Sequence, residues 1–159
     1  KAGFQIMGDW AKGEFTAAGK VPGVDYYCSP TPSNNGYLYN VDSFIFYKTS
    51  DPDKQEGQKL LAKLMMGKNF QKVFNLYKGS IPARLDVPMD EFDKCAKTSN
   101  ADIKTAGAKG GLVPSFAHGM AQGNTMKAAL QDIITEHFNS DMSSVDAANA
   151  LADSVLANM

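Results

Sequence analysis

The segment from Tyr37 to Tyr47 constrains the fold most, because aromatic and β-branched residues dominate it. Tyr37, Tyr39 and Val41 alternate with other residues, and the apolar run Phe44–Phe46 follows. This pattern is typical of a strand that enters a core. We therefore predict a strand over 37–47, preceded by two shorter strands at the apolar runs 4–7 and 24–28.

Helical patterns occupy most of the remaining chain. Asp51 followed by Pro52 is a start signal for a helix that ends near Gly67, and Asn69 is placed to cap a second helix that ends at Gly79. Further helical segments are expected after Asp9 through Phe15, from Pro88 through Cys95, over 99–108, from an Asn124 cap, and from a Ser143 or Ser144 cap. The fold class is α/β, with a few strands early and helices afterwards.

The charge balance restricts the possible partners. The 159 residues carry 16 Lys plus Arg and 17 Asp plus Glu, a net charge of -1. Without a basic excess, general binding to nucleic acid is disfavoured. No apolar stretch is long enough to span a bilayer. Arg84 is the only arginine, and we expect a structural anchor there rather than an anion-binding cluster.

Two cysteines, Cys28 and Cys95, lie far apart in the sequence. They are either two free buried thiols or one disulfide, and export to an oxidising compartment would favour the bridge. His118 and His137 are the only histidines, and four such scattered residues do not have the spacing of a zinc site.

Motifs of nucleophilic catalysis and phosphate binding are missing from the sequence. Cys95 and His118 carry no feature that marks them as a nucleophile and its base. The carboxylates of Asp90, Glu91 and Asp93 are expected to form a solvated face of a short polar segment.

A neutral polyol is the ligand class that a second group of residues fits. Recognition of a sugar ring uses an aromatic ring under its C–H face and charged or amide groups around its hydroxyls. Trp10, Asp42, Lys78 and His118 have the required chemistry. Each has an ordinary alternative: a core tryptophan, a solvent-facing edge-strand carboxylate, a cation at a helix C-terminus, and a hydrogen-bonded buried imidazole.

Five stretches in series resemble the C-terminal portion of substrate-binding proteins of carbohydrate ABC transporters, especially the periplasmic glucose/mannose-binding branch. The resemblance covers essentially the whole chain in order. The stretches are Phe4–Phe15, Cys28–Pro32, Asn40–Phe44, Asn75–Asp86 and Val113–Ala121.

The resemblance implies the fold of a type II periplasmic binding protein, with two lobes joined by a hinge and the ligand between them. Residues 1–36 would belong to the C-terminal lobe, 37–77 would cross into the N-terminal lobe, 78–87 would return through the hinge, and 88–159 would add helices to the C-terminal lobe. Since the chain begins without an initiator Met, we expect that an N-terminal portion carrying the rest of the site is missing.

The resemblance also assigns the site residues. Trp10 would stack on the sugar ring, Asp42 would accept hydrogen bonds from hydroxyls, Lys78 would donate them, and His118 would complete the rim. Cys28 and Cys95 would form the disulfide of this branch. Arg84 would anchor the hinge or a lobe, and neither a metal nor a cofactor is expected.

The function implied is that of a periplasmic receptor, not an enzyme. It would bind a monosaccharide such as a glucose-like hexose and deliver it to the membrane permease of an ABC transporter, and it would be a monomer when intact.

The alternative is a fragment of a glycoside hydrolase, which needs two carboxylates, one on each side of the glycosidic bond, and only Asp42 is suitably placed. A receptor for amino acids would need ion-pairing groups, and Arg84 is the only guanidinium.

Overall fold

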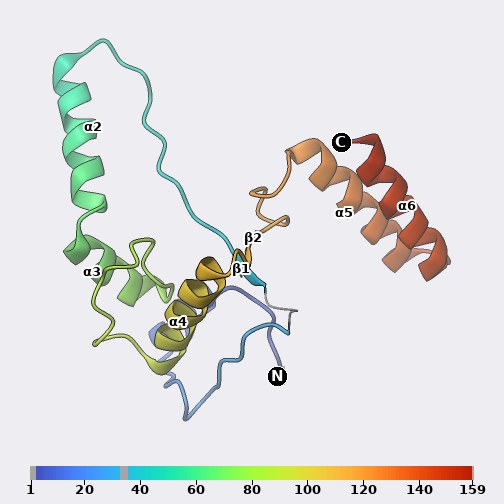
Figure 1. Ribbon diagram of the computed structural model, residues 1–159, viewed down its shortest axis with the longest axis horizontal. Helices are drawn as coiled ribbons and strands as arrows, with labels where there is room; N and C mark the ends of the chain where they lie inside the picture. The colour runs from blue at the N-terminus through green and yellow to red at the C-terminus, as the bar shows by residue number, and fades with distance from the viewer. Residues whose placement is uncertain (1–2, 33–35, 159) are drawn as a thin grey trace. The chain divides into compact units, whose positions relative to one another are not determined.

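The computed structural model describes residues 3–32 and 36–158. The chain divides into two compact units, of which the first contains the residues up to Tyr37 and Val41–Leu112. The second contains Leu38–Asn40 and the residues from Val113 onward. Figure 1 labels α2 to α6 and both strands.

The first unit starts with irregular backbone and not with the predicted strand. Residues 4–7 have no regular secondary structure, and the side chains of Phe4 and Ile6 are 96% and 88% exposed. The prediction of a strand over 24–28 is also wrong, because the described contact there is one isolated bridge between Pro22 and Tyr26. A strand requires a partner, and local apolar content does not supply one.

A short helical segment follows, as predicted near Trp10. The 3-10 helix η1 spans Asp9–Ala11 and continues into α1, Lys12–Ala17. Asp9 is not the cap, since Gly8 occupies that position without a side-chain hydrogen bond. Lys12 is buried, and its Nζ lies 2.9 and 3.1 Å from the two carboxylate oxygens of Asp93.

The predicted strand over 37–47 is confirmed only at its start. β1, Tyr37–Tyr39, pairs with β2, Leu112–Pro114, in a two-stranded sheet. The N–H of Tyr37 donates to the carbonyl of Gly111 at 2.8 Å, and the N–H of Ser115 donates to that of Tyr39 at 2.8 Å. Both strands therefore run in the same direction.

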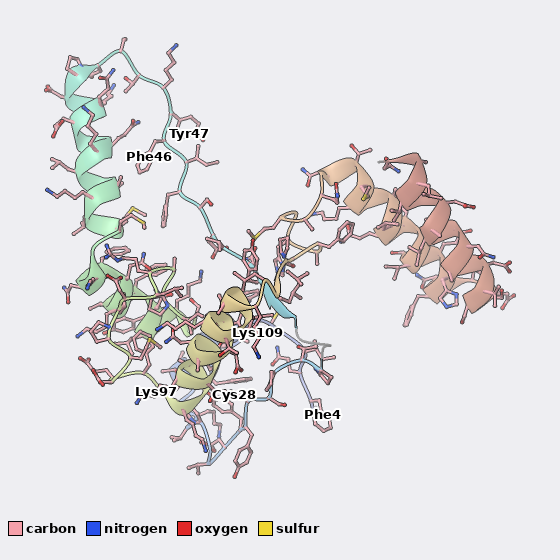
Figure 2. All side chains as sticks on the ribbon, viewed as in Figure 1. Phe4, Cys28, Phe46, Tyr47, Lys97 and Lys109 are labelled. Atoms are coloured by element: carbon pink, nitrogen blue, oxygen red, sulfur yellow. A yellow bond between two sulfur atoms is a disulfide. The ribbon has the colours of Figure 1, made fainter. Side chains whose placement is uncertain are left out.

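Residues 40–51 have no regular secondary structure, and the side chains of Phe46 and Tyr47 project from this segment in Figure 2. The apolar triplet is exposed, with 78% exposure at Ile45. Gln58 of the following helix donates from Nε2 to the carbonyl of Tyr47 at 2.9 Å. In a sheet the carbonyl of Tyr47 would accept a backbone N–H of a neighbouring strand, whereas here it accepts the side chain of Gln58.

Helices α2, Pro52–Met65, and α3, Lys68–Lys78, confirm two predicted helices. Asp51 caps α2 by accepting the N–H of Asp53 at 3.0 Å. Gly67, and not Asn69, is the N-cap of α3. Gly79 ends α3 in the left-handed conformation with φ 87°, as the sequence predicts for a C-terminal glycine.

One helix, α4, Lys94–Ala108, replaces the two short helices expected over 88–95 and 99–108. Asp93 is not part of a solvated face. Its carboxylate caps α4 by accepting the N–H of Ala96 at 2.8 Å, and it pairs with Lys12. The core of the first unit lies beside this helix and is formed by Val87, Phe92 and Ala96, against which Leu76, Ile81 and Met89 pack.

A disulfide joins Cys28 to Cys95 of α4, with the two Cα atoms 5.7 Å apart. This confirms the pairing that the family resemblance implies. It also ties an exposed segment without regular structure to a helix of the core.

The second unit is largely a helical hairpin of α5, Asn124–Asn139, and α6, Ser144–Ala157, which lie side by side (Figure 1). Gly123, and not Asn124, is the N-cap of α5. Ser143 caps α6 by accepting the N–H of Asp146 at 3.1 Å, as predicted. None of the described helices is long and apolar enough to cross a membrane.

Candidate functional site

The segment around η1 and the end of α3 come into close contact, although they are distant in sequence. The N–H of Ile81 donates to the Asp9 carboxylate at 2.9 Å. A Cβ atom on Gly13 would lie 2.7 Å from the carbonyl oxygen of Lys78, and one on Gly79 would lie 2.5 Å from the nitrogen of Gly13. The absence of side chains at these two glycines therefore allows the backbones to touch.

Trp10 lies in η1, within this contact region. The residue is half-buried, so the indole is not sealed in the core. Its six-membered ring covers Gly8, where a Cβ atom would overlap Cζ3 and Cη2 of the indole. The glycine before the aspartate thus provides the space in which the ring rests.

Asp9 adds a negative charge beside these residues. Burial raises the pKa of its carboxyl, and the N–H of Ile81 together with the cations Lys12 and Lys78 opposes that increase. The carboxylate has a structural role that the sequence did not indicate, since its hydrogen bond with Ile81 links the segment after α3 to η1.

Lys78 and Asp42 form an ion pair across 36 residues of sequence. The Lys78 side chain is 30% exposed and that of Asp42 is 64% exposed. The ammonium also lies 5.8 Å from the ring centre of Phe74, within the range of a cation–π contact. The pair presents adjacent hydrogen-bond donors and acceptors in a partly solvated position.

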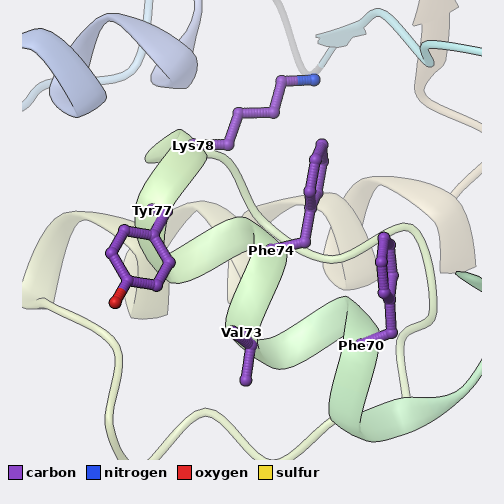
Figure 3. A pocket seen from close by; sticks show the side chains of 5 residues that line it. All are labelled: Phe70, Val73, Phe74, Tyr77 and Lys78. Atoms are coloured by element: carbon purple, nitrogen blue, oxygen red, sulfur yellow. The ribbon is translucent and has the colours of Figure 1, made fainter.

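An apolar groove lies on α3 next to Lys78, as Figure 3 shows. Its other lining residues are Phe70, Val73, Phe74 and Tyr77, with the rings of Phe70 and Phe74 stacked 5.5 Å apart. Because Lys78 is the only charged group in this lining, the groove lacks the ring of polar groups that a polyol requires. We therefore do not assign this groove to the candidate sugar site, although Lys78 lies at its edge.

His118 belongs to the second unit, whereas the other three predicted site residues belong to the first. It is exposed, and its Nδ1 lies 2.7 Å from Oγ of Ser115, which is only 3% exposed. Within the first unit, the structure thus brings Asp42 to Lys78 and the Trp10 segment to the Lys78 segment. The contact described for His118 is with Ser115 of the second unit.

Arg84 has the contacts of an anchor. Its Nε and Nη2 donate to the two oxygens of Asp86 at 2.8 and 2.7 Å, and its Nη1 donates to the carbonyl of Met66 at 3.0 Å. The guanidinium and Lys68 hold the pKa of the Asp86 carboxyl well below its ordinary value. Among residues 3–32 and 36–158, His, Cys, Asp and Glu form no group of three that could hold a metal ion.

Several residues that shape these contacts were not identified from the sequence. A glycine after a helix predicts a left-handed cap, which applies to Gly79. No sequence signal pairs Gly13 with Gly79, Asp9 with Ile81, or Ser115 with His118, because each is a tertiary relationship.

No protein-family model matches the chain. The chain is 46% identical over 156 residues to a protein of Brucella suis named "Probable sugar-binding periplasmic protein", and 43% identical over 156 residues to a protein of the same name from Rhizobium meliloti. Each alignment covers 98% of this chain and 37% of the relative. An "Uncharacterized ABC transporter extracellular-binding protein" of Pyrococcus horikoshii is 36% identical over 137 residues, which is 86% of this chain and 30% of that protein. The chain is therefore similar, over nearly all of its length, to a segment of proteins named as sugar-binding periplasmic proteins and ABC transporter binding proteins.

Proposed function

We propose that this chain is part of a periplasmic receptor that binds a monosaccharide and delivers it to the membrane permease of an ABC transporter. The observation that carries the proposal is the extended similarity to proteins named as sugar-binding and periplasmic. The chain spans 37% of the length of these relatives, so the activity proposed is that of the longer protein.

The chemistry of the first unit supports a sugar as the ligand. The half-buried indole of Trp10 offers an apolar face for the C–H side of a pyranose. Asp42 and Lys78 offer an acceptor and a donor for its hydroxyls, and hydrogen bonds to charged groups are about twice as strong as neutral ones. We infer a glucose-like hexose, the ligand class that the resemblance of the motifs implies.

We further propose that the receptor is a type II binding protein whose opposing lobe comes from the rest of the relatives' length. Residues 37–77 would then cross to that lobe and 78–87 would return from it. Ligand would favour the closed form, because only that form allows both lobes to contact the sugar. His118 would complete the rim, and Arg84 would anchor a lobe or the hinge.

A glycoside hydrolase is the less favoured alternative. Such an enzyme needs two carboxyl groups about 5–10 Å apart on either side of the glycosidic bond. Asp42 forms an ion pair with the cation of Lys78, an arrangement suited to hydrogen bonding with a neutral ligand. The relatives are also named as binding proteins.

Calorimetric titration tests the proposal. The protein that carries this chain within the length of the relatives would be titrated with glucose, galactose, mannose and xylose. We expect heat of binding with at least one hexose, and the same sugar should raise the melting temperature. The absence of both effects with all four sugars would contradict the proposal, and release of chromophore from an aryl glycoside would support the enzyme instead.

A further inference from the structure

We propose that the buried hydroxyl of Ser115 fixes His118 in the neutral tautomer that carries its proton on Nε2. Ser115 is then a positioning residue, and His118 presents an N–H donor to a ligand hydroxyl. The tautomer follows from the contacts of Ser115 and His118, whereas the contact with a ligand rests on the proposed function.

Ser115 is held rigidly before it contacts the imidazole. Its N–H donates to the carbonyl of Tyr39 at 2.8 Å, and its own carbonyl accepts the N–H of Met120 at 3.0 Å. The residue is only 3% exposed. The position of its Oγ, 2.7 Å from Nδ1 of His118, is therefore set by the backbone on both sides.

The direction of the Ser115–His118 hydrogen bond follows from the proton on the hydroxyl. Within the described part of the chain, Nδ1 of His118 is the partner found for this Oγ. If Nδ1 carried the proton and donated it, the hydroxyl proton of Ser115 would be left buried without an acceptor, which is unfavourable because the buried donor loses its hydrogen bond to water. The hydroxyl therefore donates to Nδ1, and the proton of the neutral ring is on Nε2.

His137 is in the opposite situation and provides an internal reference. Its Nδ1 lies 2.9 Å from the backbone carbonyl of Met142. A carbonyl oxygen only accepts, so Nδ1 of this ring must carry a proton. The Nε2 of His137 lies 3.5 Å from Oγ of Ser144 and, in the neutral ring, is an acceptor. The two histidines of the chain are thus predicted to have opposite tautomers.

The tautomer of His118 determines what the exposed ring can recognise. Nδ1 lies against Oγ of Ser115, and in this tautomer the other ring nitrogen, Nε2, is a donor. A sugar hydroxyl accepts such a bond through its oxygen.

Long-range 1H–15N spectra of the chain labelled with 15N-histidine test the proposal. At about pH 8.5, where imidazole is neutral, the spectrum contains only two rings and reports the protonated nitrogen of each. We expect protonated Nε2 in His118 and protonated Nδ1 in His137. A proton on Nδ1 of His118 in the unmodified chain would overturn the proposal without any need for a variant.

Substitution of Ser115 separates positioning from a purely structural role. Ser115→Ala should move the 15N shifts of His118 toward those of a mixture of tautomers and leave the shifts of His137 unchanged. Ser115→Thr, which retains a hydroxyl, should restore the single tautomer, and Ser144→Ala should leave His118 unchanged. Identical His118 shifts in Ser115→Ala and in the unmodified chain would overturn the proposal.

The contribution of this histidine to sugar binding is measured separately, in the longer protein used for calorimetry. Ser115→Ala should weaken binding of the best hexose by roughly two- to tenfold. Protonated Nε2 together with no sugar binding would support the tautomer and contradict the proposed function. Sugar binding together with protonated Nδ1 would support the function and overturn this inference.

Discussion

A Cβ atom on Gly79 would lie only 2.5 Å from the backbone nitrogen of Gly13. Gly79 also has φ +87°, a conformation that side chains disfavour. Gly79→Ala should therefore combine backbone strain with a steric clash and lower the free energy of unfolding by at least about 2 kcal/mol. Denaturant unfolding measures this change.

Two control variants separate these contributions. Gly19 has φ +70° with no atom within 4 Å of a built Cβ, so Gly19→Ala shows the cost of the conformation alone. Gly57 lies within α2 and also has open space, so Gly57→Ala should raise stability by about 0.5–1 kcal/mol. If Gly79→Ala cost no more than Gly19→Ala, the close approach to Gly13 would be refuted.

Trp10 should respond to a methyl group at Gly8, because a Cβ there would overlap the six-membered ring of the indole. In Gly8→Ala the ring must move away from the backbone, and its greater exposure should shift the fluorescence emission to longer wavelength. Trp10 is the only tryptophan, so the spectrum reports this ring alone. Gly3→Ala, with open space at its Cβ, should leave the emission unchanged.

The Cys28–Cys95 disulfide should contribute substantially to stability, because it joins residues 67 apart in sequence. Loop closure of this length restricts the unfolded chain and stabilises the folded one by about 4 kcal/mol. Reduction should lower the denaturant midpoint by the corresponding amount. A Cys28→Ala/Cys95→Ala variant should have the lower midpoint and should not respond to reductant. An equal response in both proteins would mean that the reductant acts elsewhere.

Asp9 should favour folding at acidic pH, unlike most carboxylates. Burial raises its folded pKa above the ordinary value of 3.8, so the folded state holds the proton more tightly than the unfolded state. This contribution is complete below the unfolded pKa and is lost as pH rises through the folded pKa. The stability of the natural chain relative to Asp9→Asn should therefore increase between about pH 7 and about pH 3.5.

Asp25 provides a matched comparison, because its pKa is shifted in the opposite direction from that of Asp9. The N–H of Val21 lowers the pKa of its carboxyl, so its contribution is present above the unfolded pKa and is lost as pH falls through the folded one. The natural chain should lose stability relative to Asp25→Asn over the same acid range. If the difference in unfolding free energy between the natural chain and the variant changed with pH in the same direction for Asp9→Asn and Asp25→Asn, the raised pKa of Asp9 would be contradicted.

Substitutions at Trp10 and Asp42 test the proposed sugar contacts. Trp10→Ala and Asp42→Ala should each weaken hexose binding by about 1–3 kcal/mol, through loss of the stacking surface and of a charged acceptor. Calorimetry in the longer protein gives the affinities. Lys63→Ala, on α2, is a control for loss of a surface charge and should bind the sugar normally. An unchanged affinity at either test position would remove that residue from the site.

The existence of helices α2, α3, α5 and α6 was more predictable than that of the strands, because the signals of a helix are local. The carboxylate of Asp51, the hydroxyl of Ser143 and the left-handed Gly79 each act within a few residues of a helix end. Asn69 and Asn124 were wrong as caps, since a glycine one or two residues earlier has the extended conformation that a cap needs.

Strands and tertiary contacts were less predictable, because they depend on residues elsewhere in the chain. The apolar runs at 4–7 and 24–28 have the composition of strands but lack strand pairing in the structure described. Similarly, the sequence marks Asp42 and Lys78 as suitable for a polyol, but only the fold brings their charges together. The contacts within the candidate site therefore could not be predicted from the sequence, because they depend on the tertiary fold.

The hydrogen bonds of the Arg84 guanidinium offer a way to observe local unfolding. Because no other arginine is present, an arginine-specific protease has one cleavage position in the chain. Cleavage there requires the backbone to become extended within the enzyme, which breaks the bonds from the guanidinium to Asp86 and Met66. The rate of this single cut, followed by mass spectrometry under native conditions, reports how often that region opens.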